Sequence, residues 1–333
     1  MIPAARLRAL VTGATGFIGS HLVEELLRRG FDVRCLVRPT SDTRFLETLG
    51  VELVRGDFGD AGSLVPAVSG ADHVFHLAAA LTALDWETYR AANVGATENL
   101  LLACLAANPG LKRFVFVSSI GAAGPSEKGR ARTEDDASAP ISDYGRSKLL
   151  AEEAVLRYSR RFPVVIIRPP NVVGPRQREI AEAINLIRKR IMPVLGTGEP
   201  QTSLCYVGDV VEALILAAGH PAAAGRTYFL ADPRPYSWME VNHALVRALG
   251  VRGPFLKIPY RVQLLAAALS EAAARMAKKR PRLIRDYVKA ARFRYWIYDA
   301  SRIRRELGFE TKTGLEEAVS RTVAWYRARK TDV

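Results

Sequence analysis

The chain of 333 residues has little cysteine. Cys35, Cys104 and Cys205 lie far apart in sequence, and no two of them form a CxxC pair. A disulfide framework or a structural zinc site needs closer or repeated spacings, so the sequence predicts neither. We expect the three thiols to be buried as small apolar side chains, and we expect no metal site.

Long apolar runs are absent as well. A bilayer-spanning helix needs about 18–20 uninterrupted apolar residues. The longest candidate runs, near 210–219 and 262–269, are cut or bounded by Glu212, His220 and Glu271. The first residues show no apolar segment followed by a cleavage site. We therefore expect a cytoplasmic protein, and the 49% hydrophobic and 25% charged residues are typical of a globular one.

Positive charge is in excess and unevenly placed. The formal net charge is +14. The stretch from Arg275 to Arg305 contains twelve Lys/Arg residues and only two acidic residues, Asp286 and Asp299. Such a stretch can attract nucleic acid, an anionic membrane surface or an acidic substrate, or it can be a solvated face. We expect no nucleic-acid partner and keep peripheral contact with an anionic membrane surface through residues 275–305 as an open alternative.

Short β-rich runs alternate with longer helical patterns through the first half of the chain. This alternation predicts βαβ units around a parallel sheet, in an α/β fold of the doubly wound Rossmann type. The expected strands are Leu7–Val11, Asp32–Val37, Val51–Arg55, His73–Leu77, Phe114–Ser118 and Val164–Arg168. The expected helices are Gly19–Gly30, Ala61–Val68, Trp86–Ala107 and Tyr144–Arg161.

After Arg168 the regular alternation fades and prolines accumulate. A length of roughly 100–200 residues per domain allows two units in this chain. We predict a Rossmann domain at residues 1–168 and a smaller C-terminal α/β substrate region at 169–333. A helical pattern lies at Gly208–Gly219, and we expect residues 203–219 to return to the Rossmann sheet.

Three glycines, Gly13, Gly16 and Gly19, stand at intervals of three between the first strand and the first helix. A helix N-terminus offers unpaired N–H groups and a positive dipole to a pyrophosphate, and glycine lets the backbone approach closely. The run therefore predicts a dinucleotide site at the first strand–helix junction.

The end of the second strand bears on the choice of dinucleotide. An acidic residue there would bind the ribose 2′-hydroxyl of NAD, but the sequence has Val37 followed by Arg38. Because a guanidinium suits a 2′-phosphate, we expect NADP(H), with NAD(H) as the alternative. Asp57, beside Phe58 at the third strand's end, is placed for the adenine amino group.

Tyr144 and Lys148 lie one helical turn apart on one face of a predicted helix. A phenol of pKa about 10 serves as a base near neutrality only where a cation stabilises its phenolate. Lys148 can supply that cation. The hydroxyls of Ser118 and Ser119, at the fifth strand's end, can hydrogen-bond the substrate oxygen whose proton Tyr144 exchanges.

Together, the glycine run, the Ser118–Ser119 strand end, Tyr144xxxLys148 and the Asn93-Val94-Gly95-Ala96-Thr97 helix resemble the extended short-chain dehydrogenase/reductases. The resemblance implies a nicotinamide cofactor and a triad of Ser119, Tyr144 and Lys148. It also implies a homodimer formed through the helices that contain Asn93 and Tyr144, with Asn93 either in the site or packing that helix. The expected cofactor contacts are Gly13, Thr15, Gly16, Phe17, Ile18, Gly19, Arg38, Asp57, Phe58, Leu77, Ala78, Ala79, Tyr144, Lys148 and Pro170.

Members of this family catalyse different reactions, and departures from their sequence patterns help to choose among these reactions. Ser119 is followed by Ile120 and Gly121 rather than by the acidic pair of the dehydratases, so we expect no dehydration. Asn171 falls where nucleotide-sugar enzymes have an asparagine near the substrate. Thr202, however, stands seven residues before Asp209, where those enzymes have an arginine that grips the diphosphate. The Ser203–Val210 stretch instead looks like that of 3-beta-hydroxysteroid dehydrogenases and dihydroflavonol-reductase-like proteins.

We therefore expect an oxidoreductase that moves a hydride between the nicotinamide and a secondary alcohol or ketone of an apolar, sterol-, terpenoid- or flavonoid-like substrate contacting Ser119 and Asn171. The alternatives are an NAD-dependent nucleotide-sugar epimerase and a non-catalytic dinucleotide sensor. The apolar residues of 255–269 and 283–297 either line the substrate pocket or pack on the Rossmann domain. We expect Trp296 and Tyr298 to anchor the C-terminal core.

Overall fold

Seven parallel strands form the central sheet of the computed structural model, which describes residues 6–195, 198–277, 281 and 283–329. The strand order is β11-β6-β5-β4-β1-β2-β3, so the chain turns from one half of the sheet to the other beside β1. This is the doubly wound order of a Rossmann fold, as predicted. The strands are β1 (Arg8–Thr12), β2 (Asp32–Val37), β3 (Glu52–Arg55), β4 (His73–His76), β5 (Arg113–Val117), β6 (Val164–Arg168) and β11 (Arg226–Phe229).

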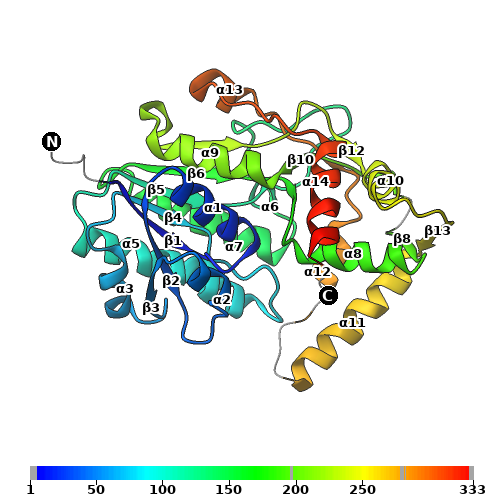
Figure 1. The fold of residues 1–333 in the computed structure, drawn as a ribbon, viewed down its shortest axis with the longest axis horizontal. Coiled ribbons are helices and arrows are strands. Elements are labelled where there is room, and N and C mark those ends of the chain that lie inside the picture. Colours follow the sequence, from blue (N-terminus) through cyan, green and yellow to red (C-terminus); the bar gives the residue numbers. More distant parts are fainter. Residues whose placement is uncertain (1–5, 196–197, 278–280, 282, 330–333) are drawn as a thin grey trace.

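Helices cover both faces of this sheet (Figure 1). On one face, α1 (Phe17–Arg28) packs against α9 (Val207–Gly219), and on the other α3 (Ala61–Val68), α5 (Ala96–Ala107) and α7 (Asp143–Arg157) pack in sequence. A short α2 (Arg44–Thr48) precedes β3. The central strands are buried on both sides, which explains their continuous runs of β-branched and aromatic residues.

The seventh strand, β11, was missing from the sequence prediction. Its sequence, RTYF, has a charged and a polar residue at its start, and it pairs with β6 at the sheet edge. The preceding helix α9 contacts α1 and β5. Chain from beyond residue 168 thus lies within the Rossmann layers, and the limits 1–168 and 169–333 remain a prediction.

The predicted helix Trp86–Ala107 is divided into three pieces. A π-helical turn at Arg90–Gly95 separates α4 (Trp86–Tyr89) from α5. A π turn widens the helix by one residue and often marks a functional position. Asn93 lies within this turn and is buried.

The rest of the C-terminal chain forms three small sheets and its own hydrophobic core. Its sheets pair β7 (Asn171–Val173) with β10 (Leu204–Tyr206), β8 (Met192–Leu195) with β13 (Phe255–Ile258), and β9 (Gln201–Thr202) with both β12 (Tyr236–Ser237) and β14 (Tyr295–Trp296). The core lies among α8 (Arg178–Arg188), α10 (Trp238–Leu249) and α14 (Leu315–Ala328). The remaining helices are α6 (Ile120–Ala123), α11 (Tyr260–Ala277), α12 (Arg285–Ala290), α13 (Ser301–Leu307) and a 3₁₀ turn at Pro221–Ala223.

Tyr298 is buried, its hydroxyl donates to the Gly124 carbonyl oxygen at 2.6 Å, and Trp296 packs beside it. Their buried neighbours are Ile120, Ala123 and Phe229, so these two side chains join the C-terminal region to α6 and β11 and do not lie in the C-terminal core, contrary to the expectation. The three cysteines are free and buried. In the basic stretch 275–305, residues 278–280 and 282 lie outside the described residues. None of the helices described is long and apolar enough to cross a membrane.

Candidate functional site

The glycine run forms a tight cradle between β1 and α1. Gly13 has φ of +71°, and a Cβ atom there would lie 2.7 Å from the backbone nitrogen of Ala78. A Cβ at Gly19 would lie 2.2 Å from the carbonyl oxygen of Gly13. Larger residues are therefore excluded at both positions by backbone contact, as the predicted close approach requires.

The N-terminus of α1 is open to an anion. Gly16 occupies the N-cap position, and no side chain caps the first amides of the helix. Thr15, Phe17 and Ile18 lie on the same turn. Uncapped amides with the positive end of a helix dipole fit a pyrophosphate, so the residues present fit the predicted dinucleotide.

The carboxyl ends of β2 and β3 carry the residues predicted to contact the adenosine half. Arg38 is exposed directly after the buried Val37, and Asp57 is exposed after β3. Phe58 is half-buried, with its ring centroid 5.7 Å from that of His76. The register pairs Val37 with Arg55, so a second exposed cation stands at this edge, which the sequence analysis missed.

The end of β4 is fixed by a buried polar chain that the sequence analysis did not identify. The Ala78 N–H donates to the Thr12 hydroxyl at 3.2 Å, which in turn contacts Nδ1 of His76 at 2.7 Å. Nε2 of His76 contacts the hydroxyl of Thr97 at 3.0 Å, and that hydroxyl donates to the Asn93 carbonyl. Leu77 and Ala79, beside Ala78, are half-buried.

This hydrogen-bond pattern indicates which ring nitrogen of His76 carries the proton. Because Thr97 already donates to a carbonyl, it accepts from His76 Nε2, so Nδ1 accepts from Thr12. Burial and, to a smaller extent, the nearby Lys148 lower the pKa of His76 to about 3. His76 therefore stays neutral and positions the backbone on which the cofactor is expected to lie.

Asn93 joins the segment after β4 to the helix of Tyr144. Its Oδ1 accepts from the Ala80 N–H at 2.7 Å, and its Nδ2 donates to the Ala80 carbonyl at 3.1 Å and to the Ser147 hydroxyl at 2.8 Å. Ser147 donates to the Tyr144 carbonyl. Through these bonds Asn93 connects its π-helical turn to the segment after β4 and to α7.

Ser119 and Tyr144 meet at the carboxyl end of β5. The Ser119 hydroxyl and the Tyr144 ring lie side by side next to Gly121, and the Ser119 oxygen accepts from the Gly121 N–H at 3.0 Å. Gly145 makes this approach possible, because a Cβ there would lie 2.3 Å from the Gly121 carbonyl oxygen. Burial raises the pKa of Tyr144 to about 12, and the nearby Ser119 hydroxyl acts in the opposite direction. The hydroxyl of the neighbouring Ser118 is buried without a partner among the described residues.

Lys148 lies one turn after Tyr144 and is buried. Its ammonium donates to the Val117 carbonyl at 2.8 Å and stands 4.1 Å from the centroid of the Phe116 ring. Burial lowers its pKa to about 7, while Glu152 raises it. The predicted helix face therefore brings Ser119, Tyr144 and Lys148 to one strand end.

A buried ion pair beneath this helix was not predicted. Glu152, one turn beyond Lys148, accepts from Nε and Nη2 of Arg168 at 2.9 and 2.6 Å. Arg168 also donates to the Ser138 hydroxyl at 3.0 Å. The i,i+4 spacing from Lys148 to Glu152 was the available signal, since it places both on one face.

Pro170 is buried at the end of β6, and Asn171 begins β7. Nδ2 of Asn171 donates to the Thr202 hydroxyl at 2.7 Å. Thr202 is itself buried and donates to the Ser203 carbonyl. The position at which nucleotide-sugar enzymes have their arginine is thus a small buried side chain bound to protein groups.

The C-terminal helix α12 contacts α7, the helix of Tyr144 and Lys148, which the sequence did not reveal. Asp286 accepts from the Asp143 N–H at 3.0 Å, at the start of α7. The Tyr287 hydroxyl donates to the Leu81 carbonyl at 2.7 Å, the same carbonyl that accepts from Tyr89. Two adjacent residues of α12 therefore attach the C-terminal region beside Tyr144.

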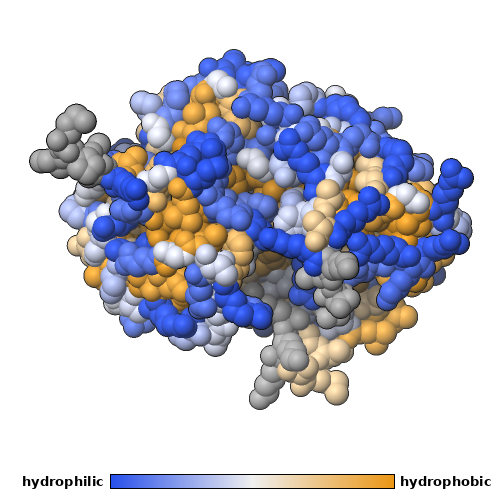
Figure 2. Space-filling model, viewed as in Figure 1, coloured by the Kyte–Doolittle hydropathy of each residue, from blue (hydrophilic) through white to orange (hydrophobic). Residues whose placement is uncertain are grey.

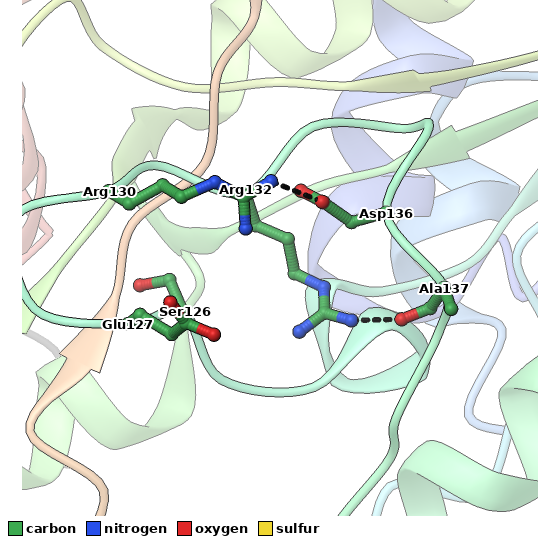
Figure 3. Close-up of a pocket in the computed structure, with 6 residues that line it drawn as sticks. All are labelled: Ser126, Glu127, Arg130, Arg132, Asp136 and Ala137. Carbon is green, nitrogen blue, oxygen red and sulfur yellow. Dashed lines mark hydrogen bonds and ion pairs between the residues drawn. The ribbon is translucent and has the colours of Figure 1, made fainter.

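A polar hollow lies in the loop between α6 and α7 (Figure 3). Arg130 pairs with Asp136, and Arg132 donates to the Ala137 carbonyl. Ser126 and Glu127 complete its lining. These internal bonds secure the loop that precedes Tyr144.

The described residues contain no group of three or more His, Cys, Asp or Glu side chains suited to a metal ion.

Comparison with known families identifies the family to which the chain belongs. Residues 9–231 match the NAD dependent epimerase/dehydratase family. The chain belongs to this family. The resemblance to the extended short-chain dehydrogenase/reductases is thereby confirmed, and a nicotinamide dinucleotide is the family's cofactor.

Three relatives in this family are named as reductases or dehydrogenases. The 4-hydroxy-2-methyl-3-oxo-4-farnesyl-3,4-dihydroquinoline-1-oxide ketoreductase of Stigmatella aurantiaca is 32% identical, over 80% of each chain. The ceramide reductase of Caulobacter vibrioides is 29% identical, over 98% of this chain and 97% of the relative. The 3 beta-hydroxysteroid dehydrogenase/Delta 5-->4-isomerase of Mycobacterium tuberculosis is 31% identical, over 75% and 72%.

Solved structures agree on the fold. MoeE5 in complex with UDP-glucuronic acid and NAD superposes with a TM-score of 0.76 at 29% identity, covering 97% of this chain and 99% of that one. That structure contains NAD, in agreement with the dinucleotide cradle described above.

Proposed function

We propose that this family member is an NADP(H)-dependent oxidoreductase for a secondary alcohol or ketone of an apolar substrate. The observation that carries the proposal is the placement of Ser119 and Tyr144 side by side next to Gly121, with the Lys148 ammonium at the end of the same strand, on the Val117 carbonyl. We propose Tyr144 as the acid and base, Ser119 as the group that orients the substrate oxygen, and Lys148 as the cation that stabilises the phenolate.

The raised pKa of Tyr144 has different consequences for reduction of a ketone and for oxidation of an alcohol. With its pKa raised to about 12, Tyr144 holds its proton near neutrality and is suited to protonate the oxygen of a ketone being reduced. In the opposite direction Tyr144 must lose that proton, and Lys148 stabilises the phenolate only while it is itself charged. A bound nicotinamide would supply the hydride in the first direction and accept it in the second.

The apolar substrate class is supported by two observations. The relatives named above are described as acting on a farnesylated quinoline, a ceramide and a hydroxysteroid. Thr202, buried and bound to Asn171, offers no cation for a diphosphate. Asn171 remains the proposed substrate contact at this place. The polar hollow of Figure 3 is unsuited to an apolar molecule because ionic and hydroxyl side chains line it.

The NADP(H) preference is supported by the end of β2. Arg38 is exposed there and Arg55 stands across from the strand end, so two cations adjoin the expected ribose position. A carboxylate that would bind a 2′-hydroxyl is absent between Val37 and Thr40. A guanidinium binds a phosphate through two parallel hydrogen bonds.

We further propose a homodimer through α5 and α7. Leu102 and Leu105 on α5 and Leu156 on α7 are exposed apolar side chains, and Arg157 and Glu98 join the two helices at 2.9 Å. Apolar side chains on adjacent helices are typical of the buried part of a subunit interface.

A nucleotide-sugar epimerase is the second candidate, favoured by the position of Asn171 and by the sugar nucleotide bound to MoeE5. The test is to denature freshly purified protein and identify the released dinucleotide. Near-stoichiometric NAD, together with no net change at 340 nm during turnover, would support the epimerase. An empty protein that binds NADPH reversibly and oxidises it with an apolar ketone would support the reductase.

A further inference from the structure

Helix α11 carries a row of exposed apolar side chains. Val262, Leu265, Leu269 and Met276 recur at spacings that place them on one face of the helix. Leu265, Leu269 and Met276 are 61, 62 and 88% exposed, more than most apolar side chains of the described chain. In Figure 1 the helix extends from the body of the molecule, and Figure 2 shows apolar colours along it.

The opposite face of α11 is anchored. Ala267 and Ala274 are buried there, and buried Gln263 donates to the Ile258 carbonyl at 2.7 Å. Glu271, also buried, accepts from the backbone N–H of Arg285 at 2.7 Å and from its Nε at 2.9 Å. The apolar row is thus held pointing away from the protein by contacts behind it.

Basic residues predominate on and near α11, although Asp85 faces Arg275. Residues 1–168 contain 20 Lys/Arg and 19 Asp/Glu, whereas residues 169–333 contain 28 and 15, so nearly all of the net charge lies in the second half. Arg261 and Arg275 border the apolar row, and Arg292 stands 5.1 Å from the Tyr260 ring at the N-terminal end of α11. The single acidic residue in α11, Glu271, is buried in its ion pair.

We propose that the exposed face of α11 docks on an anionic phospholipid bilayer, with its apolar row in the interface and the bordering cations at the phosphate groups. An apolar face combined with flanking basic residues is the pattern of helices that lie in the membrane plane. The binding is peripheral, since none of the described helices could span a membrane.

The anchored face of α11 is connected to the proposed active site. Arg285, which binds Glu271 of α11, begins α12, and the next residue, Asp286, binds the first amide of α7. Docking of α11 would therefore bring α12 and the start of α7, and with them the proposed site for an apolar substrate, toward the bilayer. This last step rests on the proposed function, but the docking itself does not.

The test is flotation of the purified chain with vesicles of phosphatidylcholine alone or with one quarter phosphatidylglycerol. We expect partition into the anionic vesicles, at least tenfold weaker partition into the neutral ones, and weaker binding at high salt. The double variant Leu265→Ser/Leu269→Ser should lose at least tenfold in partition. Leu186→Ser, an exposed leucine on α8 in the same basic half, should bind as the wild type does.

A second measurement is independent of any loss of folding. Met276→Cys introduces one accessible thiol, because Cys35, Cys104 and Cys205 are buried. An environment-sensitive fluorophore on that thiol should shift to shorter wavelengths when anionic vesicles are added.

Each of the following results would overturn the proposal: equal partition into neutral and anionic vesicles, an unshifted fluorophore, or unchanged binding by the double leucine variant. Self-association that the double variant abolishes, without vesicle binding by the wild type, would assign α11 to a contact between copies instead. Vesicle binding without any ketone reduction would contradict the proposed function alone.

Discussion

The two halves of the molecule are built from different interactions. Around the site, residues 1–168 use buried polar groups that satisfy one another, such as Thr12–His76–Thr97 and the ammonium of Lys148 on a carbonyl. The C-terminal half has its own apolar core, attaches to the site through few hydrogen bonds, and carries most of the net positive charge and the uncovered face of α11. The proposed catalytic groups thus lie in the first half, and the proposed docking surface lies in the second.

The largest expected effect is on turnover. Tyr144→Phe removes the proton donor while keeping the ring, so we expect turnover to fall about 10²–10⁴-fold. Tyr287→Phe, in the C-terminal half, loses only a hydrogen bond to the Leu81 carbonyl and should retain turnover within about tenfold. Rates of NADPH oxidation and NADPH binding isotherms for both variants test this. Near wild-type turnover in Tyr144→Phe with intact cofactor binding would contradict the mechanism.

A buried and an exposed ion pair should differ in stability. Glu152→Gln leaves Arg168 charged in the interior without its partner, and we expect a loss of about 3–5 kcal/mol in the free energy of unfolding. Glu316→Gln breaks the exposed pair with Arg247 and should cost less than about 1 kcal/mol. Urea unfolding of both variants measures the difference, and equal losses would contradict the expected difference between the buried and the exposed pair.

The glycine cradle should tolerate no side chain. Gly19→Ala places a Cβ 2.2 Å from the Gly13 carbonyl oxygen, so backbone must shift at about 1–3 kcal/mol and cofactor affinity should fall at least tenfold. Gly110→Ala meets no atom within 4 Å and serves as the matched control. Thermal unfolding and NADPH titration are the measurements. Unchanged NADPH affinity in Gly19→Ala would argue against the cradle as the binding place.

Lys148 should make stability depend on pH. Its pKa of about 7 in the folded chain lies below the ordinary value of 10.5, so between these values the unfolded chain holds a proton that the folded chain has lost. The contribution of Lys148 to stability therefore rises with pH across this window, by at most about 1.4 kcal/mol per pH unit. Lys148→Met should flatten the rise, and Lys257→Met, at an exposed position, should not. The unfolding free energies of the wild type and both variants at pH 7.5 and 9.5 test this expectation.

The smallest effect concerns the choice of dinucleotide. Arg38→Ala removes the cation proposed to hold the 2′-phosphate, and we expect the preference for NADPH over NADH to fall about tenfold, since 1.4 kcal/mol is a factor of ten. Arg44→Ala, which breaks an exposed pair with Asp42, is the control. The ratio of the Michaelis constants for NADPH and NADH measures this preference. An unchanged ratio would favour NAD as the cofactor.

The sequence predicted the first half well because its constraints are local. Strand runs buried on both faces, glycines at one junction and Tyr144 one turn before Lys148 can all be identified within short windows. The partners of His76 come from residues far apart in the chain, and the contact of Asp286 with α7 spans 143 residues, so no short window contains them. Strand β11 was missed because it is four residues long and starts with Arg226 and Thr227.

The six-residue helix α12 has a consequence for the way in which such enzymes diversify. Asp286 binds a main-chain amide of α7 rather than a side chain, so the attachment does not depend on which residues α7 carries on its surface. A different α11–α12 hairpin that keeps a carboxylate at position 286 could make the same bond to α7. The sequence of the hairpin can therefore vary without a matching change in the side chains of α7.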